Sequence, residues 1–272
     1  MEHLLAAWTK VVEQLRDASR ILLLSDYDGT LAPIVERPEL ASLPENIRRL
    51  LEALARQRRV TVGIISGRAL GDLMSKVNIG GIIYAGNHGL EIQGPGVSFI
   101  NPLAAEIAPV LRIIRYLLSR ALRRTSGAIV EDKGLTLSVH YRLVDEEREG
   151  EVKDAVEQVV GGAQALGKVK ITTGKKVYEV RPVVTWDKGK AVKLLMKKYG
   201  KGGRKSRLLP VYLGDDRTDE DAFAVVAKYG NGVSVFVGDP EQETSARYFL
   251  TSPAEVDRFL SLLLDHARKG FR

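Results

Sequence analysis

Cysteine is absent from this chain of 272 residues. Without thiols the protein has no disulfides, no thiol nucleophile and no cysteine-bound zinc. Aromatic residues are few, and no uninterrupted apolar run approaches the roughly 18 residues that a membrane-spanning helix needs. The apolar residues near the N-terminus alternate with charges at helical spacing, which differs from the design of a signal peptide. We therefore expect a soluble, cytoplasmic protein.

The chain is 44% hydrophobic and 28% charged, a mixture that buries a substantial core and excludes disorder. Its 41 Lys and Arg residues against 34 Asp and Glu residues give a net charge of +7. This excess raises two alternatives, a nucleic-acid binder or an enzyme for a small anion. Paired basic residues lie on separate predicted helices, without an aromatic-interleaved basic stripe to support nucleic-acid binding. These pairs are Arg48–Arg49, Arg58–Arg59, Arg123–Arg124 and Lys197–Lys198.

Buried strands alternate with amphipathic helices in the first and last parts of the chain. The strands are predicted at residues 21–25, 60–65, 82–84, 208–213 and 233–237, and the helices at 2–18, 44–57, 70–77, 188–199, 220–228 and 253–267. Continuous apolar runs are typical of strands covered on both faces of a parallel sheet. The alternation predicts a Rossmann-like, doubly wound α/β fold.

The pattern changes between these two parts. A helix at 102–123 and strands at 128–131 and 135–141 are followed by a helix at 145–160 and strands at 169–172 and 177–181. Two helix–strand–strand units indicate a separate α+β module inserted into the α/β core. We therefore predict a core domain of residues 1–102 and 182–272 and an inserted domain of residues 103–181.

Polar clusters follow the predicted core strands, where open α/β sheets bind their ligands. Residues 26–31, Asp-Tyr-Asp-Gly-Thr-Leu, follow the first core strand. A calcium loop of the EF-hand type is excluded because Leu31 stands where that loop requires glycine. One interpretation is an Asp-Gly turn. The other is catalytic, with Asp26 attacking phosphorus and Asp28 acting as general acid and base.

Two further polar positions lie at helix starts. Ser66, in Ser-Gly-Arg after the second core strand, could donate to a phosphate oxygen together with nearby N–H groups. The structural alternative for Ser66 is an ordinary helix N-cap. Lys188 could neutralise phosphoryl charge in a transition state, or could simply be a solvated lysine.

The last cluster contains five acidic residues among the seven from Asp215 to Asp221. A charged first helical turn explains some of them through the helix dipole. A hard cation explains the remainder better, because Mg²⁺ prefers one or two carboxylates together with waters and a substrate phosphate. We predict Asp26 and Asp215 as direct ligands, with Asp216 and Asp219 behind them.

Taken together, these motifs resemble the haloacid dehalogenase-like (HAD) phosphatases. Asp-Tyr-Asp-Gly-Thr at 26–30, Ser66, Lys188 and Gly-Asp-Asp-Arg-Thr-Asp at 214–219 match the four motifs of that superfamily in order. Longer segments resemble trehalose-6-phosphate phosphatases within it. These segments are residues 26–34, 65–68, 86–92, 131–134, 139–142, 178–182 and 214–223.

The resemblance implies a role for each matching residue. Asp26 is the nucleophile and Asp28 the acid/base, while Ser66 and Lys188 hold the transferring phosphoryl group. Mg²⁺ is held by Asp26, the Asp28 carbonyl and Asp215. The resemblance also implies that the inserted domain is a cap that binds the substrate. Its sugar hydroxyls are expected to be bound by Glu131, Lys133, Arg142 and Glu179. Arg68, Asn87 and His88 are also expected to bind substrate.

The function implied is Mg²⁺-dependent hydrolysis of trehalose 6-phosphate. One alternative is another sugar phosphate, such as sucrose phosphate or a mannosyl- or glucosyl-phosphoglycerate. A second is a catalytically dead sugar-phosphate sensor, which the intact Asp26–Asp28 pair does not favour. The chain has no room for a glycosyltransferase domain, so a trehalose-phosphate synthase is expected to be a separate pathway partner.

Overall fold

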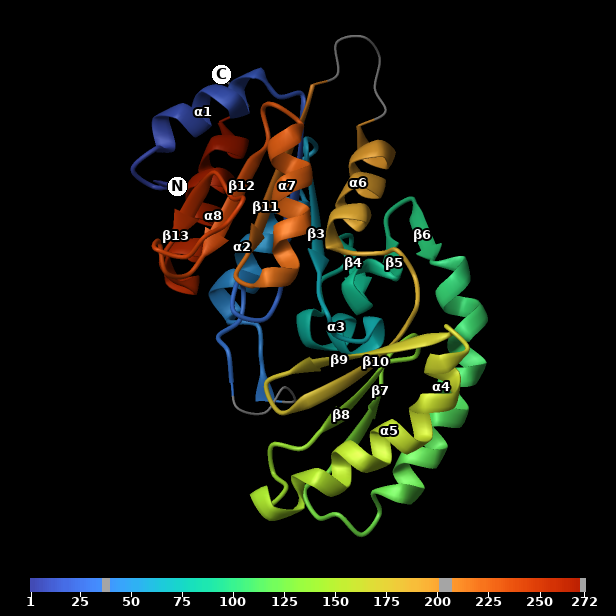
Figure 1. The fold of residues 1–272 in the computed structure, drawn as a ribbon. Coiled ribbons are helices and arrows are strands. Elements are labelled where there is room, and N and C mark those ends of the chain that lie inside the picture. Colours follow the sequence, from blue (N-terminus) through green and yellow to red (C-terminus); the bar gives the residue numbers. More distant parts are fainter. Residues whose placement is uncertain (36–39, 201–206, 270–272) are drawn as a thin grey trace. The chain divides into compact units, whose positions relative to one another are not determined.

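The computed structural model describes residues 1–35, 40–200 and 207–269. The chain divides into two compact units, one formed by Met1–Phe99 with Trp186–Arg272 and the other by Ile100–Thr185 (Figure 1). Each unit has its own sheet, with two hydrophobic cores in the first unit and one in the second. Among the described residues, no helix combines the length and apolar character needed to cross a membrane.

The first unit is built on a largely parallel sheet. In spatial order its strands are β1 (Glu2–His3), β13 (Tyr248–Leu250), β12 (Val233–Val237), β11 (Leu208–Gly214), β2 (Arg20–Ser25), β3 (Val60–Ile65), β4 (Ile83–Gly86), β5 (Glu91–Gly94) and β6 (Val97–Ile100). The pairs from β1 to β4 are parallel, whereas β5 runs antiparallel to β4. This order places β2 and β11 side by side at the centre.

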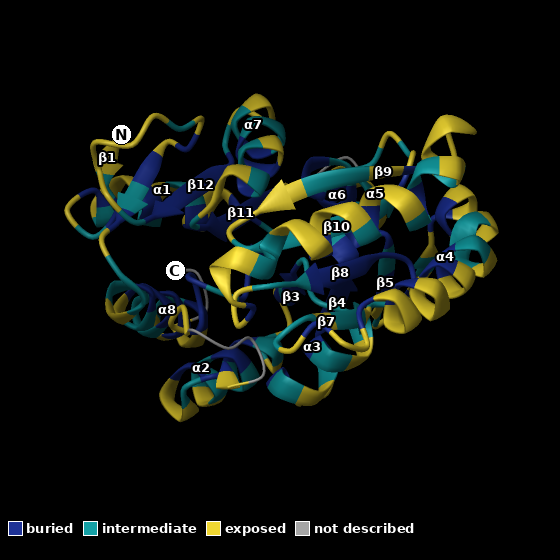
Figure 2. Cartoon of the chain, turned by 60° about the horizontal axis from the view of Figure 1, so that its bottom comes forward, coloured by how far each residue is buried: buried dark blue, intermediate teal, exposed yellow. Residues whose placement is uncertain are grey.

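Helices cover both faces of this sheet, as the continuous apolar strands predict. Alternate side chains of β2 enter different cores, with Leu23 in one and Leu22 and Leu24 in the other. The strands β11 and β12 are buried along their whole length (Figure 2). The first core contains α1 (Trp8–Asp17), α2 (Glu45–Ala55), α3 (Leu70–Val77) and α8 (Pro253–Arg268), and the second contains α6 (Lys188–Tyr199) and α7 (Glu220–Lys228). The doubly wound fold is confirmed.

The second unit packs two helices against one face of an antiparallel sheet. Its strands, in spatial order, are β7 (Ile129–Asp132), β8 (Leu137–His140), β10 (Val177–Pro182) and β9 (Val169–Gly174), and its helices are α4 (Pro102–Ala121) and α5 (Glu149–Ala165). Leu137, Val139 and Val180 face the helices. Because side chains alternate along a strand, Glu131 and Glu179 share the opposite face, on either side of Ser138.

The predicted bounds of α3, α6, α7, β3 and β12 are confirmed residue by residue. The helix predicted at 2–18 is wrong in its first part, because Glu2 and His3 pair with Tyr248 and Phe249 and the helix begins only at Trp8. The helix predicted from Asp145 begins with a short 3₁₀ turn at Glu146–Arg148. The strands β1, β5, β6 and β13 were not predicted, because each has four residues or fewer and lacks a clear periodicity.

Candidate active site

Two central strands bring the first and last acidic motifs together. Asp26 follows β2 and Asp215 follows β11, which lie side by side with Leu213 opposite Ser25. The backbone N–H of Asp26 donates to the carbonyl of Leu213 at 2.8 Å. Carboxylate oxygens of Asp26, Asp215 and Asp219 lie within 4.8 Å of one another. The convergence that the sequence predicts at the carboxyl ends of the strands is therefore present for these three side chains.

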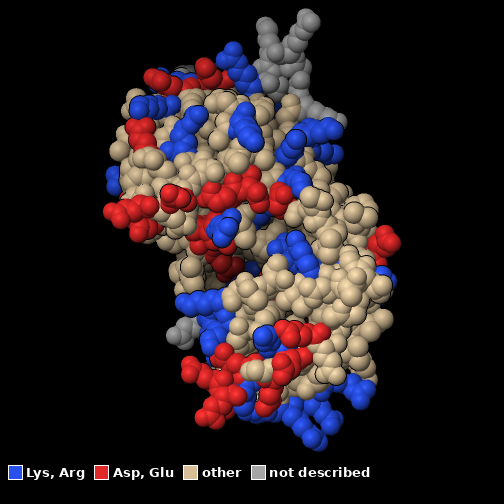
Figure 3. Space-filling model, viewed as in Figure 1, with Lys and Arg blue, Asp and Glu red and all other residues tan. Residues whose placement is uncertain are grey.

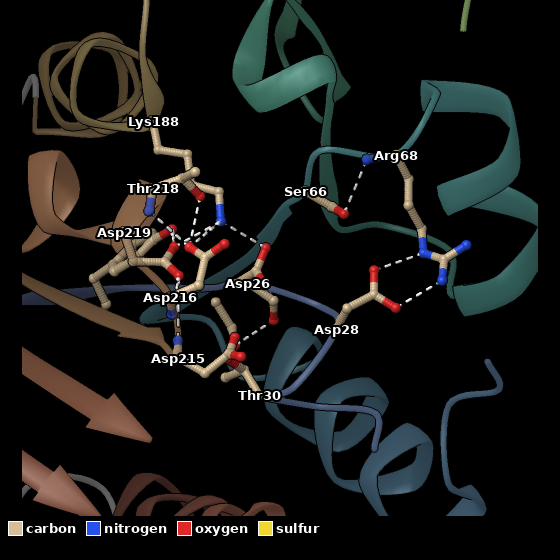
Figure 4. A network of polar contacts seen from close by, with 12 residues as sticks. Asp26, Asp28, Thr30, Ser66, Arg68, Lys188, Asp215, Asp216, Thr218 and Asp219 are labelled. Atoms are coloured by element: carbon tan, nitrogen blue, oxygen red, sulfur yellow. Dashed lines mark hydrogen bonds and ion pairs between the residues drawn. The ribbon is translucent and has the colours of Figure 1, made fainter. Parts of the chain in front are cut away.

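Lys188, at the first position of α6, reaches into this carboxylate cluster. Its Nζ donates to Asp26 Oδ1 at 2.9 Å and to Asp219 Oδ1 at 2.7 Å (Figure 4). The side chain is buried, which is costly for an ammonium unless it is paired and hydrogen-bonded. Burial acts to lower the pKa of Lys188, but the carboxylates of Asp26 and Asp219 outweigh it and raise this pKa. The interpretation of Lys188 as a solvated lysine is wrong.

The surroundings of Asp26 and Asp215 disfavour the charged form of both side chains. Burial raises the pKa of Asp26 well above its ordinary value, and Lys188 acts in the opposite direction. Burial, followed by repulsion from Asp219 and Asp216, raises the pKa of Asp215 to about 7. Three clustered carboxylates face one ammonium, so a bound cation would relieve their mutual repulsion.

Asp219 holds its neighbours in place rather than pointing freely into the cluster. Its Oδ1 accepts from Lys188 and from the Tyr212 hydroxyl, the latter at 2.6 Å. Its Oδ2 accepts the backbone N–H groups of Asp215 and Asp216, each at 3.2 Å. Asp216 in turn caps the short 3₁₀ helix Arg217–Asp219 by accepting from the Thr218 N–H. The structural interpretation of a charged first turn is correct for Glu220 and Asp221, which lie in the first turn of α7.

Asp215 is the more open carboxylate of the cluster. Within the described ranges, the only hydrogen-bond donor to its side chain is the Thr30 hydroxyl, 3.0 Å from Oδ1. Gly29 lies against the other oxygen, with a positive φ of 81°. A Cβ at Gly29 would stand only 1.9 Å from Asp215 Oδ2. Glycine is therefore required here for its backbone conformation and for the space that it leaves. The clustered carboxylate oxygens of Asp26, Asp215 and Asp219 fit a divalent cation.

The Ser-Gly-Arg motif follows β3 in a loop before α3. Helix α3 begins at Leu70 and has Ala69 at its N-cap, so the interpretation of Ser66 as a helix N-cap is wrong. The buried hydroxyl oxygen of Ser66 instead accepts the backbone N–H of Arg68 at 3.2 Å. The Arg68 side chain makes a bidentate contact with Asp28, from Nε to Oδ2 at 2.7 Å and from Nη2 to Oδ1 at 2.6 Å. Two predicted site residues are thus paired with each other.

Asn87 and His88 form a tight turn directly after β4 and pack against this loop. Both have positive φ angles, of 50° and 57°, and their backbone N–H groups donate to the carbonyls of Arg68 and Ser66. The buried side chain of Asn87 donates to Glu91 Oε1 at 2.8 Å. The His88 ring lies so close to Gly67 that a Cβ there would be 2.8 Å from its Cε1. These contacts show how both residues shape the Ser66–Arg68 loop.

The second unit has its own polar cluster on the sheet face opposite its helices. Lys133 Nζ lies 3.6 Å from Glu179 Oε1 and 3.9 Å from Glu131 Oε2. His140 Nε2 is 2.8 Å from Glu131 Oε2. Arg142, in the loop after β8, donates to the carbonyl of Lys175 at 3.4 Å. Carboxylates and an ammonium group on one face suit a network of sugar hydroxyls.

Comparison with known proteins decides the family. Residues 24–254 match the trehalose-phosphatase family model. The chain belongs to this family. A probable trehalose-phosphate phosphatase of Oryza sativa subsp. japonica is 36% identical over 95% of this chain and 73% of its own length. The earlier resemblance to trehalose-6-phosphate phosphatases is confirmed.

Solved structures of other proteins share the fold of this trehalose-phosphatase family member. The C-terminal domain of the C. albicans trehalose-6-phosphate phosphatase matches with a TM-score of 0.77 and 25% identity, covering 94% of this chain and 96% of that one. A haloacid dehalogenase-like hydrolase from Bacteroides thetaiotaomicron matches with a TM-score of 0.60 and 16% identity, covering 90% and 99%. At that identity the second likeness concerns the fold alone. The HAD-like fold is confirmed.

Proposed function

We propose that this enzyme hydrolyses trehalose 6-phosphate to trehalose and phosphate through an aspartyl-phosphate on Asp26. Membership of the trehalose-phosphatase family supports the substrate. One structural observation carries the chemistry: the buried Asp26 carboxylate at the end of β2, held by Lys188 and beside Asp215. A buried carboxylate oriented by an ammonium suits attack on a phosphoryl group.

The reaction has two displacements at phosphorus. An oxygen of Asp26 attacks, the bond from phosphorus to the sugar oxygen breaks, and Asp28 gives its proton to that oxygen. Asp28 then takes a proton from water, whose oxygen attacks the aspartyl-phosphate, releasing phosphate and restoring the Asp26 carboxylate. Lys188 and the Ser66 hydroxyl would donate to the phosphoryl oxygens, where negative charge is spread in the transition state.

The proposed cofactor is Mg²⁺, held by Asp26, the Asp28 carbonyl and Asp215. Asp216 and Asp219 would support these ligands from behind, as their contacts with Lys188 and the 215–216 backbone suggest. When bound, the ion supplies positive charge that stabilises the phosphoryl oxygens. The acidic cluster fits a divalent cation, and the choice of magnesium is part of this proposal.

Sugar recognition is assigned to the polar cluster of the second unit. Glu131, Lys133 and Glu179 would bind hydroxyls of the disaccharide, with Arg142 supporting them. Near Ser66, the substrate-binding roles of Arg68, Asn87 and His88 stay predictions. Arg68 and Asn87 already contact Asp28 and Glu91, which favours an indirect role for both.

The proposed partner is a small anionic sugar ester, with no nucleic acid and no membrane. Lys and Arg side chains form several separate groups among Asp and Glu on the face drawn in Figure 3. The family match does not favour a different sugar phosphate. A cytoplasmic location and a separate synthase stay predictions.

A substrate panel tests the proposal. Phosphate release would be measured with Mg²⁺ on trehalose 6-phosphate, sucrose 6-phosphate, glucosyl-3-phosphoglycerate and glucose 6-phosphate. We expect kcat/KM to be at least about tenfold higher for trehalose 6-phosphate, because a site built to hydrogen-bond hydroxyls rejects sugars that leave its groups unpaired. Preference for another ester would overturn the substrate assignment. A protein that binds these esters without releasing phosphate would be a sensor.

A further inference from the structure

Three charged side chains form a row that ends at the proposed acid/base. Arg68 contacts both oxygens of Asp28 through Nε and Nη2, and its Nη1 donates to Asp72 Oδ2 at 2.9 Å (Figure 4 draws the Asp28–Arg68 pair). The planar guanidinium has a fixed fork of donors, so contacts on two edges fix its orientation. No motif in the sequence singles out Asp72.

The guanidinium between the two carboxylates is well enclosed. Its side chain is only 10% exposed, whereas those of Asp28 and Asp72 are 39% and 40% exposed. The Tyr27 ring lies beneath it, with the Arg68 Cζ 5.3 Å from the ring centroid. Burial acts to lower the pKa of Arg68, but Asp28 and Asp72 outweigh it and raise this pKa. Arg68 is therefore a permanently charged and ordered part of the loop.

Asp72 is the one member of this row that lies on a regular element. It occupies the first turn of α3, four residues after Arg68, and its other oxygen is 4.0 Å from Lys76 Nζ. Asp28 and Arg68 both lie in loops outside the assigned helices and strands. Asp72 therefore connects the orientation of a loop arginine to a rigid helix.

We infer that Asp72 is a positioning residue, which acts through Arg68 to aim the Asp28 carboxyl at the oxygen of the leaving sugar. This inference rests on the proposed function. A general acid must come within hydrogen-bond reach of the atom that it protonates. When Asp28 is protonated, one hydrogen bond from Arg68 to its carbonyl oxygen suffices to orient the carboxyl group. The O–H of the same carboxyl group then points to the leaving oxygen.

The leaving group provides the test. A sugar alkoxide needs a proton as it departs, whereas the nitrophenolate of p-nitrophenyl phosphate departs without one. The value of kcat/KM covers only the steps up to departure of the leaving group, so it isolates this proton transfer from the later hydrolysis of the aspartyl-phosphate. We would measure kcat/KM of Asp72→Ala on trehalose 6-phosphate and on p-nitrophenyl phosphate, in the full-length protein with Mg²⁺.

We expect Asp72→Ala to lower kcat/KM for trehalose 6-phosphate by about 10- to 100-fold, the range seen when a supporting partner is lost. The value for p-nitrophenyl phosphate should change by less than about threefold, because that reaction does not use the acid. Arg68→Lys, which keeps the charge but not the fork, should show the same contrast. The matched control is Glu45→Ala, which removes an acidic residue from the first turn of α2 and its pair with Arg49, and should leave both values unchanged.

An equal loss on both substrates would overturn the inference, because it would indicate general damage to the loop. No loss on trehalose 6-phosphate would overturn it too. If Asp72→Ala does not fold, as judged by circular dichroism, Asp72→Asn keeps the shape of the side chain and is subject to the same comparison. A wild-type protein inactive on trehalose 6-phosphate would instead refute the proposed function, so the two failures are distinguishable.

Discussion

The ammonium of Lys188 lies 2.9 Å from the Asp26 carboxylate, and both side chains are buried. Neither charge is well solvated, so each depends on the other to remain in place. Asp219 contacts the same ammonium at 2.7 Å and is anchored by Tyr212 and two backbone N–H groups. The nucleophile proposed for this enzyme is therefore oriented by a chain of buried contacts that extends to β11 and α6.

Replacing Lys188 by methionine should lower kcat on trehalose 6-phosphate by at least about 100-fold, the cost of removing one donor to developing charge. It should also destabilise the protein by about 3 kcal/mol, because it leaves buried carboxylates without their partner. Steady-state kinetics and denaturant unfolding would measure the two effects. Lys190→Met is the control, since Lys190 is two residues away and pairs with Asp187 in a half-exposed position. Near-normal kcat in Lys188→Met would contradict the role given to this lysine.

Gly29→Ala should weaken metal binding by more than about tenfold, since the new methyl group would collide with Asp215 Oδ2. The dependence of activity on Mg²⁺ concentration measures this change. Gly96→Ala serves as the control, because Gly96 also has a positive φ, of 70°, but open space where its Cβ would stand. Similar Mg²⁺ requirements in both variants would show that Gly29 does not protect the metal site.

Mg²⁺ should stabilise the protein more at alkaline than at acidic pH. With its pKa raised to about 7, Asp215 keeps a proton in the metal-free fold that it loses in the unfolded chain above pH 3.8. The stability of the metal-free protein should therefore fall as pH rises between these values. A metal must displace that proton, so its affinity should rise with pH up to about 7. The rise in Tm on adding Mg²⁺ should be larger at about pH 8 than at about pH 5, and Asp215→Asn should reduce the difference.

Substitutions in the polar cluster of the second unit should weaken binding of the sugar and leave phosphoryl transfer unchanged. Glu131→Gln and Glu179→Gln should each raise KM for trehalose 6-phosphate about tenfold, the effect of losing one charge-assisted hydrogen bond. Turnover of p-nitrophenyl phosphate, which has no sugar, should stay within about twofold. Glu157→Gln, on the exposed face of α5, is the matched control. Equal losses on both substrates would refute the division of roles.

Much of the fold follows from local sequence pattern. Helices such as α6 and α7 have clear starts and amphipathic periodicity, and the continuous apolar strands identify a parallel sheet covered on both faces. The meeting of Asp26 and Asp215 could also be predicted, because parallel neighbouring strands end at the same edge. The strand β1 could not, since two residues acquire their conformation only by pairing with β13, far away in the chain.

Contacts between loops could not be predicted from the sequence. Asp28 and Arg68 are separated by 40 positions, and no periodicity indicates which way either side chain turns. The sequence therefore did not indicate the contacts of Arg68 with Asp28 and Asp72, and its substrate-binding role stays a prediction. The contact between His140 and Glu131 could not be predicted either, because it depends on the register of β7 and β8.

Phosphate release from trehalose 6-phosphate by the unmutated protein and by Asp26→Asn is the most direct test of an Mg²⁺-dependent phosphatase with Asp26 as nucleophile. We expect release that requires Mg²⁺ and is lost on chelation, and a fall of at least about 1,000-fold in Asp26→Asn, because an amide is a poor nucleophile. Asp17→Asn, at an exposed site, should behave as the unmutated protein. No release by the unmutated protein, or undiminished release by Asp26→Asn, would contradict the proposed mechanism.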